Sequence, residues 1–234
     1  MPKRKFSFSV GEFYHIYNRG NSKQKIFIDS EDYYRFLKFV YLSNSKKSIN
    51  FRDDIVTPNI EAFDFDRGET LVDIGAWVLM PNHFHIYVTP TPTVNSPRRG
   101  LGGGEDLAVP IFMQKLCTAY SMYFNKKYKR TGKLFEGAFK SVEIKGDEKA
   151  KYLFSYIHLK TVKLIEQQWK TKPLHNIKKV IDFLNNYKYS SYLDHKGIAR
   201  KENKIIFLKN FPRYFKNIKE LDKEIFDWLT YSQI

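Results

Sequence analysis

The chain has very little cysteine, no long apolar segment and too few acidic residues to balance its basic ones. Its 234 residues include a single cysteine, Cys117, which excludes an intramolecular disulfide and any zinc site built on several cysteines. No run of 18 apolar residues occurs, as a membrane-spanning helix would require, and the basic residues 1–5 are not followed by the apolar stretch of a secretory signal. We therefore expect a cytoplasmic protein with no membrane partner.

The shortage of acidic residues leaves a large positive charge. Forty Lys and Arg residues face 25 Asp and Glu residues, which gives a formal net charge of +15. A strong positive charge spread over the chain favours a polyanionic partner, and nucleic acid is the commonest one. An AT-rich genome would explain the excess of Lys over Arg, but not the imbalance between bases and acids. The charge thus predicts nucleic-acid binding and association with the nucleoid.

The residue patterns predict an α+β fold. Alternating or β-branched runs predict strands, and apolar residues at helical spacing predict helices. We expect strands at 13–17, 71–79, 83–88 and 141–144, a short one near 60–65, and helices at 29–41, 107–128, 148–165, 177–185 and 219–229. A Pro-, Ser- and Gly-rich connection occupies 89–106. The order matches the split βαβ pattern of a ferredoxin-like core with a central antiparallel sheet, placed in residues 1–170 and followed by a helical extension in 171–234.

Two histidines one residue apart are the most informative feature of the chain. They lie in the segment Pro81–Val88, and side chains in a strand alternate between its faces. His83 and His85 therefore project from one face together with Tyr87, while the intervening apolar residues project from the other face and can pack into a core. We expect a solvent-accessible histidine pair that supplies two ligands of a metal site.

A helix that carries tyrosines is the second feature of the sequence that could take part in catalysis. Tyr152, Tyr156, Lys160 and Lys163 follow one stripe of the helix expected at 148–165, beside the apolar stripe that would dock on the sheet. A tyrosine at the margin of such a helix could reach the histidines, as a nucleophile for phosphoryl transfer requires. Its ordinary pKa is near 10, and a metal ion or Lys160 one turn away would favour the phenolate. Packing alone is the simpler role for either tyrosine.

Several ordered blocks of the sequence resemble a known family. Pro81–His85 matches the HUH motif, in which U is a bulky apolar residue, and Tyr156–Leu159 followed by Val162 resembles the nucleophile helix of single-tyrosine HUH transposases. The REP-associated tyrosine transposases are the branch that the chain resembles. The other matching blocks are Tyr14–Asn21, Arg130–Gly137, Phe139–Ser141 and Tyr189–Tyr192.

The resemblance implies the HUH endonuclease fold and an activity on DNA. It implies a metal-dependent single-stranded DNA endonuclease and strand transferase that acts on hairpins and mobilises repetitive palindromic elements. His83 and His85 would bind Mg²⁺ or Mn²⁺, and Tyr156 would form a 5′-phosphotyrosine intermediate. Tyr152 is a rival nucleophile, because some HUH replication initiators use two tyrosines four residues apart. Arg19, Arg130, Lys140 and Lys160 are the residues expected to contact DNA.

One position departs from the family. Members usually carry an amide side chain four residues after the tyrosine as the third metal ligand, and here that residue is Lys160, whose ammonium cannot ligate a metal. Glu143, His158 or water could complete the site, or Lys160 could replace part of the metal's charge. A domesticated protein that binds hairpins without cleaving them is the alternative, followed by an RNA-binding module and a hydrolytic metalloenzyme. The sequence leaves open whether the chain acts as a monomer or as a homodimer.

Overall fold

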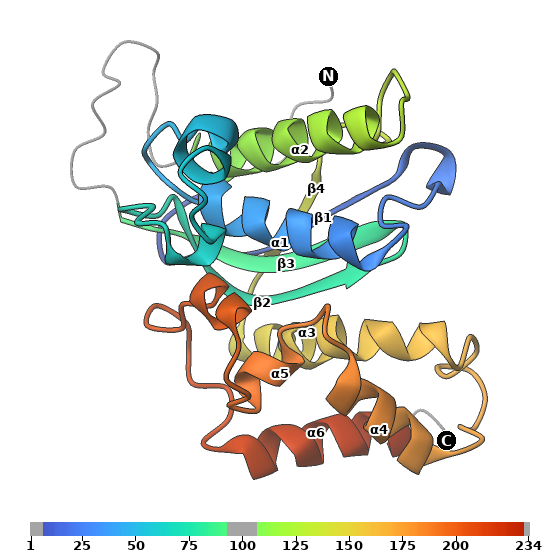
Figure 1. The fold of residues 1–234 in the computed structure, drawn as a ribbon. Coiled ribbons are helices and arrows are strands. Elements are labelled where there is room, and N and C mark those ends of the chain that lie inside the picture. Colours follow the sequence, from blue (N-terminus) through green and yellow to red (C-terminus); the bar gives the residue numbers. More distant parts are fainter. Residues whose placement is uncertain (1–6, 93–106, 232–234) are drawn as a thin grey trace.

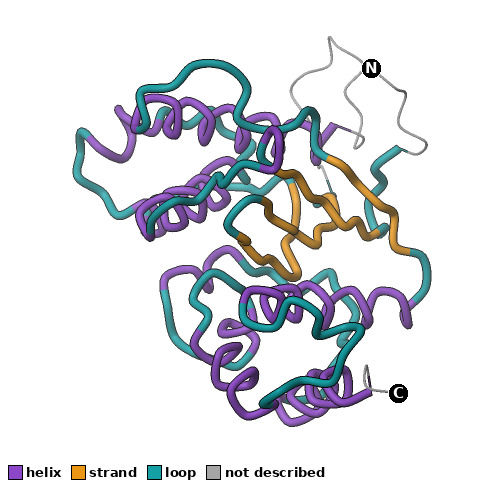
Figure 2. The backbone as a smooth tube through the Cα atoms, turned by 90° about the vertical axis from the view of Figure 1, so that its right-hand side faces the viewer, coloured by secondary structure: helices purple, strands orange, loops and turns teal. Residues whose placement is uncertain are grey.

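A four-stranded antiparallel sheet lies between two layers of helices (Figures 1 and 2). The computed structural model describes residues 7–92 and 107–231. Its strands are β1 (Phe13–Arg19), β2 (Val72–Met80), β3 (His83–Pro90) and β4 (Lys140–Ile144). They are arranged in the order β2-β3-β1-β4, and every neighbouring pair is antiparallel. This order confirms the predicted ferredoxin-like core. Most of the connection expected at 89–106 lies outside the described residues.

The first face of the sheet packs against α1 (Ser30–Ser43) and α2 (Ala108–Lys127), above the sheet in Figure 1. Alternation along the strands decides which residues face these helices. Buried and partly exposed residues alternate along β1, and the apolar residues of β3 that were predicted to face the core are buried in it. The sheet residues of this core include Tyr14, Ile16, Phe84, Ile86 and Val88. Large aromatic side chains fill it, and burying each of them stabilises the fold by about 2 kcal/mol or more.

The second face of the sheet is covered by the rest of the chain, below the sheet in Figure 1. This layer contains α3 (Asp147–Leu159), α4 (Ile177–Asn186), α5 (Tyr192–His195) and α6 (Ile218–Tyr231). Tyr87 is fully buried here, in a core that also contains Leu153, Ile157 and Leu184. The expectation that the histidine face is open to solvent is therefore wrong for most of β3. Residues on both sides of position 170 build this core, and the domain boundary proposed there stays a prediction.

The outer edge of β2 is protected by a segment from the C-terminal part of the chain. The Leu79 N–H donates to the Tyr189 carbonyl, and the Ser191 N–H donates to the Trp77 carbonyl, each at 2.9 Å. The Ser191 hydroxyl accepts from the Trp77 N–H at 2.9 Å. These bonds pair the backbone groups of an edge that would otherwise invite another strand.

Two expected elements differ in the structure. Residues 60–65 form no strand; Ala62–Asp64 is a 3₁₀ turn whose first two residues are buried. The predicted helix 148–165 is α-helical only to Leu159 and tightens into a 3₁₀ turn, η5, over Lys160–Leu164. The Thr161 hydroxyl donates to the His158 carbonyl at 3.0 Å, a local bond that competes with the α-helical pattern. Within residues 7–92 and 107–231, no helix combines the length and apolar character needed to cross a bilayer.

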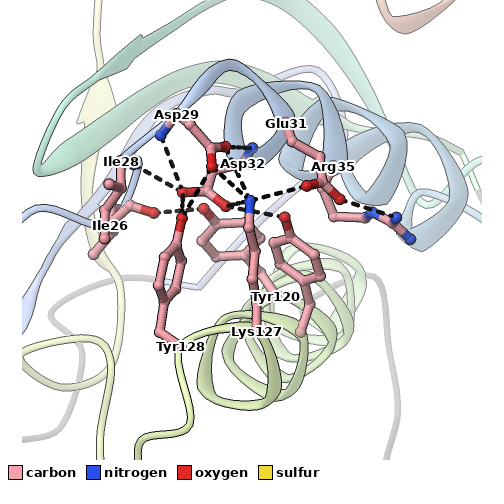
Figure 3. A network of polar contacts seen from close by, with 10 residues as sticks. Ile26, Ile28, Asp29, Glu31, Asp32, Arg35, Tyr120, Lys127 and Tyr128 are labelled. Carbon is pink, nitrogen blue, oxygen red and sulfur yellow. Dashed lines mark hydrogen bonds and ion pairs between the residues drawn. The ribbon is translucent and has the colours of Figure 1, made fainter.

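A buried carboxylate joins α1 to α2 (Figure 3). Asp29 and Asp32 form the capping box that begins α1, and the Asp32 side chain is fully buried. Asp32 accepts hydrogen bonds from the hydroxyls of Tyr123 at 2.9 Å and Tyr128 at 2.8 Å. Lys127 lies 2.9 Å from both Asp32 and Asp29. Since a buried charge is costly unless it is paired and hydrogen-bonded, each donor supports this contact between the helices.

Asp32→Ala should lower the free energy of unfolding by about 3 kcal/mol or more, because it leaves buried donors and Lys127 without their acceptor. Glu31→Ala is the matched control. Glu31 also contacts Lys127, at 3.0 Å, but its side chain is 60% exposed, so the loss should stay below about 1 kcal/mol. Urea unfolding of both variants measures the difference, and equal losses would contradict this account.

Candidate functional site

A cavity of about 320 Å³ lies where the histidine strand meets the tyrosine helix. His83 and Met80 line it from the turn between β2 and β3, Tyr156 lines it from α3, and Lys160 lines it from the start of η5. The remaining lining residues come from the segment that follows: Lys163, Gln167, Gln168, Trp169, Lys170 and Thr171. The structure thus brings His83, Tyr156 and Lys160 together, three of the residues singled out in the sequence.

The two histidines are held so that each keeps one ring nitrogen free. His83 Nδ1 lies 2.6 Å from Asn82 Oδ1; because the amide oxygen only accepts, Nδ1 carries the proton and Nε2 keeps a lone pair. His85 Nδ1 lies 2.8 Å from His15 Nε2. His85 Nε2 is buried and has no hydrogen-bond partner among the described residues. The two rings are perpendicular, with centroids 5.1 Å apart.

The turn that carries Asn82 is fixed by the segment after β1. The Gly20 N–H donates to the Asn82 carbonyl and the Ile26 N–H donates to the Pro81 carbonyl, both at 2.8 Å. A side chain at Gly20 would place its Cβ 2.3 Å from the Gln24 carbonyl oxygen, so only glycine fits this close approach. The geometry of the turn at Asn82 therefore depends on a glycine 62 residues earlier in the chain.

His15 is a site residue that the sequence did not reveal. No pattern in the sequence pairs His15 with another histidine, yet β1 pairs with β3 so that His15 lies opposite Tyr87 and Tyr17 lies opposite His85. Directly opposed residues share a face of the sheet, and the rings of His15 and His85 stack with centroids 4.9 Å apart. The alternation along β1 indicates which face of the strand carries His15. Only the pairing of β1 with β3 shows that this face also carries His85.

Burial keeps these imidazoles neutral. Burial first and the positive charge of Lys160 second lower the pKa of His83 and that of His15 to about 4. The pKa of His85 is lowered well below its usual value, again by burial first and Lys160 second. At neutral pH one nitrogen of each ring therefore keeps a lone pair, and the neutral ring is the form that binds a metal.

Tyr156 is distinguished from Tyr152 by its charged surroundings. The ammonium groups of Lys160 and Lys170 lie 4.8 Å and 4.1 Å from the centre of the Tyr156 ring. Burial alone would raise the pKa of Tyr156, but these two lysines outweigh it and lower the pKa. Burial raises the pKa of Tyr152, which contacts Trp228 at 4.8 Å between ring centroids and does not line the cavity with His83. Of the two tyrosines, Tyr156 is the one that lines the cavity with His83 and has a lowered pKa.

Three of the residues expected to contact DNA lie outside the cavity, two of them on the sheet and one in a loop. Arg19 is exposed at the end of β1, lies opposite His83 in the strand pairing, and forms an ion pair with Glu136. Lys140 is exposed at the start of β4, opposite Tyr17. Arg130 lies in the loop after α2, with its guanidinium 5.6 Å from the centre of the Phe124 ring. Neither Arg130 nor Lys140 lines the cavity.

Two of the groups considered as a third metal ligand lie elsewhere. Glu143 pairs with Tyr14, which faces the first core, so Glu143 shares that face and projects from the side of the sheet opposite the histidines. His158 Nε2 lies 2.9 Å from the Ser191 hydroxyl, fully buried. In the described part of the chain, no three His, Cys, Asp or Glu side chains are grouped to hold a metal ion. The Nε2 atoms of His83 and His85 fit a divalent metal as two ligands, and nitrogen donors suit Mn²⁺ better than Mg²⁺.

Comparisons with known proteins give a distant structural similarity. No known sequence family matches the chain, and no curated protein matches it. Among solved structures, the chain is similar to a REP-associated tyrosine transposase bound to a REP hairpin, with 13% sequence identity and a TM-score of 0.46. The match covers 86% of this chain and 90% of that one. A similarity of this size assigns no activity to the chain.

Lys170→Met should raise the pKa of Tyr156 towards the ordinary value near 10, because it removes the nearer of two cations that favour the phenolate. Titration of tyrosinate absorbance, as a difference from the same titration of Tyr156→Phe, isolates this residue. Lys149→Met, at an exposed position in the first turn of α3, is the control and should cause no shift. A Tyr156 pKa unchanged in Lys170→Met would show that Lys170 does not act on the phenol.

Proposed function

We propose that the protein is a metal-dependent single-stranded DNA endonuclease and strand transferase that acts on hairpin DNA through Tyr156. The observation that carries the proposal is the shared cavity of His83, Tyr156 and Lys160. The lowered pKa of Tyr156, the free ring nitrogen of His83 and the ammonium group of Lys160 around this cavity support the proposal. That combination suits attack on a phosphate, whose developing negative charge the cations stabilise.

In the proposed reaction the Tyr156 oxygen attacks a backbone phosphorus and expels the 3′-oxygen of the preceding nucleotide. The products are a 5′-phosphotyrosine and a free 3′-hydroxyl. Because one phosphate ester replaces another, a second 3′-hydroxyl can reverse the step and join strands without ATP. A divalent metal held by His83 and His85 would polarise the phosphate oxygens. Lys160 and Lys170 keep the phenol ready to lose its proton.

The DNA partner is proposed from charge and position. Backbone contacts by Lys160 and Arg19 would lead a strand past His83, while Lys140 and Arg130 would hold DNA outside the cavity. The net charge of +15 supports binding that weakens strongly as salt increases. Transposition or mobilisation of repetitive palindromic elements, in the nucleoid, is the setting we propose. One chain supplies both His83 and Tyr156 to the cavity, so this arrangement needs no second copy.

The nucleophile can be tested by a covalent adduct on a denaturing gel. The protein would be mixed with single-stranded hairpins from the DNA that flanks its gene, with Mn²⁺ or Mg²⁺ and with EDTA. We expect a metal-dependent adduct that disappears in Tyr156→Phe, while hairpin affinity changes little. Tyr152→Phe is the matched control and should keep the adduct. An adduct that persists in Tyr156→Phe would contradict the assignment of Tyr156 as the nucleophile.

A non-cleaving hairpin-binding protein is the second candidate. The lysine at position 160, where an amide ligand is expected, and the absence of a third grouped ligand among the described residues favour it. Tight hairpin binding with no adduct under any metal condition would establish this alternative. If Lys160→Gln then restored the adduct, the missing amide ligand at position 160 would be the reason that the wild type does not cleave DNA.

His15→Phe should weaken Mn²⁺ binding by about 10- to 100-fold, because it removes the hydrogen bond that orients the His85 ring. Bound Mn²⁺ can be measured directly by the loss of the free-ion EPR signal, without any assay of activity. Tyr17→Phe, on the same strand face, is the control. His15→Gln keeps a hydrogen-bonding group and should recover part of the affinity; equal affinity in all three variants would contradict the role of His15.

A further inference from the structure

Three lysines meet on one side of the cavity without acidic partners. Lys160, Lys163 and Lys170 all line it, and its lining contains no Asp or Glu. No ion pair is formed by any of the three within the described residues. Many other lysines are paired with carboxylates, including Lys38, Lys46, Lys127, Lys151 and Lys196. The cavity therefore concentrates positive charge that nothing in the described protein neutralises.

The neutral groups of the lining complete the donor set. Gln167, Gln168 and Thr171 provide amide and hydroxyl groups beside the three ammonium groups. Like charges held together destabilise a fold, and a bound anion removes that cost. Ammonium and amide N–H groups are suited to the several acceptor oxygens of a phosphate.

The placement of Lys170 is built into the fold. The segment after η5 turns back on itself: the Glu166 N–H donates to the Val162 carbonyl at 2.8 Å, and the Trp169 N–H donates to the Glu166 carbonyl at 3.3 Å. Trp169 is only 5% exposed and belongs to the second core. Because its neighbour is anchored in this way, the ammonium group of Lys170, although the residue is exposed, lies 4.1 Å from the centre of the Tyr156 ring.

We propose that Lys160, Lys163 and Lys170 form a phosphate-binding cradle that holds the backbone phosphate of a single strand against Tyr156. The inference rests on the proposed function and adds to it a site that works without the metal. The cradle recognises the phosphate oxyanion, which a free phosphate ion shares with a phosphodiester. The strand is the source we favour, because the cavity opens between the proposed nucleophile and His83.

The first arm of the test uses inorganic phosphate with the full chain in EDTA, at constant ionic strength. Phosphate should raise the melting temperature of the wild type, since a ligand that binds only the folded state stabilises it. The rise should be lost in Lys170→Met and in Lys163→Met. Lys149→Met is the matched control: it lies on the same helix as Tyr156, about 16 Å along the axis from Lys160, and should respond as the wild type does.

The second arm measures binding of a single-stranded oligothymidylate in EDTA at several salt concentrations. Each lysine that contacts a backbone phosphate adds about 0.7 to the slope of log affinity against log salt. Lys170→Met and Lys163→Met should each lower the slope by about that amount and the affinity about tenfold at low salt. Lys149→Met and Tyr156→Phe should leave the slope unchanged.

The outcomes separate the cradle from the catalytic proposal. If both lysine variants keep the wild-type slope and the phosphate response, the cradle is overturned, whatever the adduct assay shows. If they lose the phosphate response but keep the slope, the site binds free phosphate and the assignment to a strand is overturned. If the slope falls as expected while the wild type forms no adduct, the cradle stands and the nuclease proposal fails.

Discussion

The antiparallel pairing of β1 with β3 is the constraint on which the candidate site depends. These are the two central strands of the sheet; β3 is buried on both faces for most of its length, whereas β1 has one buried and one partly exposed face. The register places Arg19 opposite His83 and Tyr17 opposite His85. A slip of β1 by one residue would turn His15 into the aromatic core and move Ile16 to the histidine face. The fully buried apolar face of β1 therefore specifies the register strongly, and with it the contact of His15 with His85.

Burial and charge act in opposite directions on the two kinds of titratable group in the site. Desolvation disfavours the charged form of any side chain, so the buried imidazoles stay neutral and keep a free nitrogen. The same burial would also keep Tyr156 protonated. Lys160 and Lys170 reverse the effect for the phenol alone, because their ammonium groups lie against its ring. One cavity thus combines a neutral imidazole, that of His83, with a tyrosine whose pKa is lowered.

The layers away from the cavity hold its parts in place. On the first face, the buried carboxylate of Asp32 joins α1 to α2 through tyrosine and lysine donors. On the second face, Tyr189 and Ser191 close the edge of β2, and His158 on the tyrosine helix contacts Ser191. The C-terminal segment therefore connects the helix that carries Tyr156 to the sheet that carries the histidines. We infer that removing this segment would disturb the site without touching a residue that lines the cavity.

Local pattern alone determined much of this protein: the alternation of His83 and His85 against an apolar face, the capped start of α1 at Asp29, the stripe that carries Tyr156 and Lys160, and the surplus of positive charge. These features depend on residues within a few positions of each other. Only the tertiary structure decided that helices cover the histidine face, that His15 meets His85, that Lys170 folds back over Tyr156, and that Glu143 and His158 lie apart from the histidines. Such contacts depend on how strands pair and where a loop returns. The periodicity of a single segment carries no information about either, because it reports which side of an element is buried and not what lies against that side.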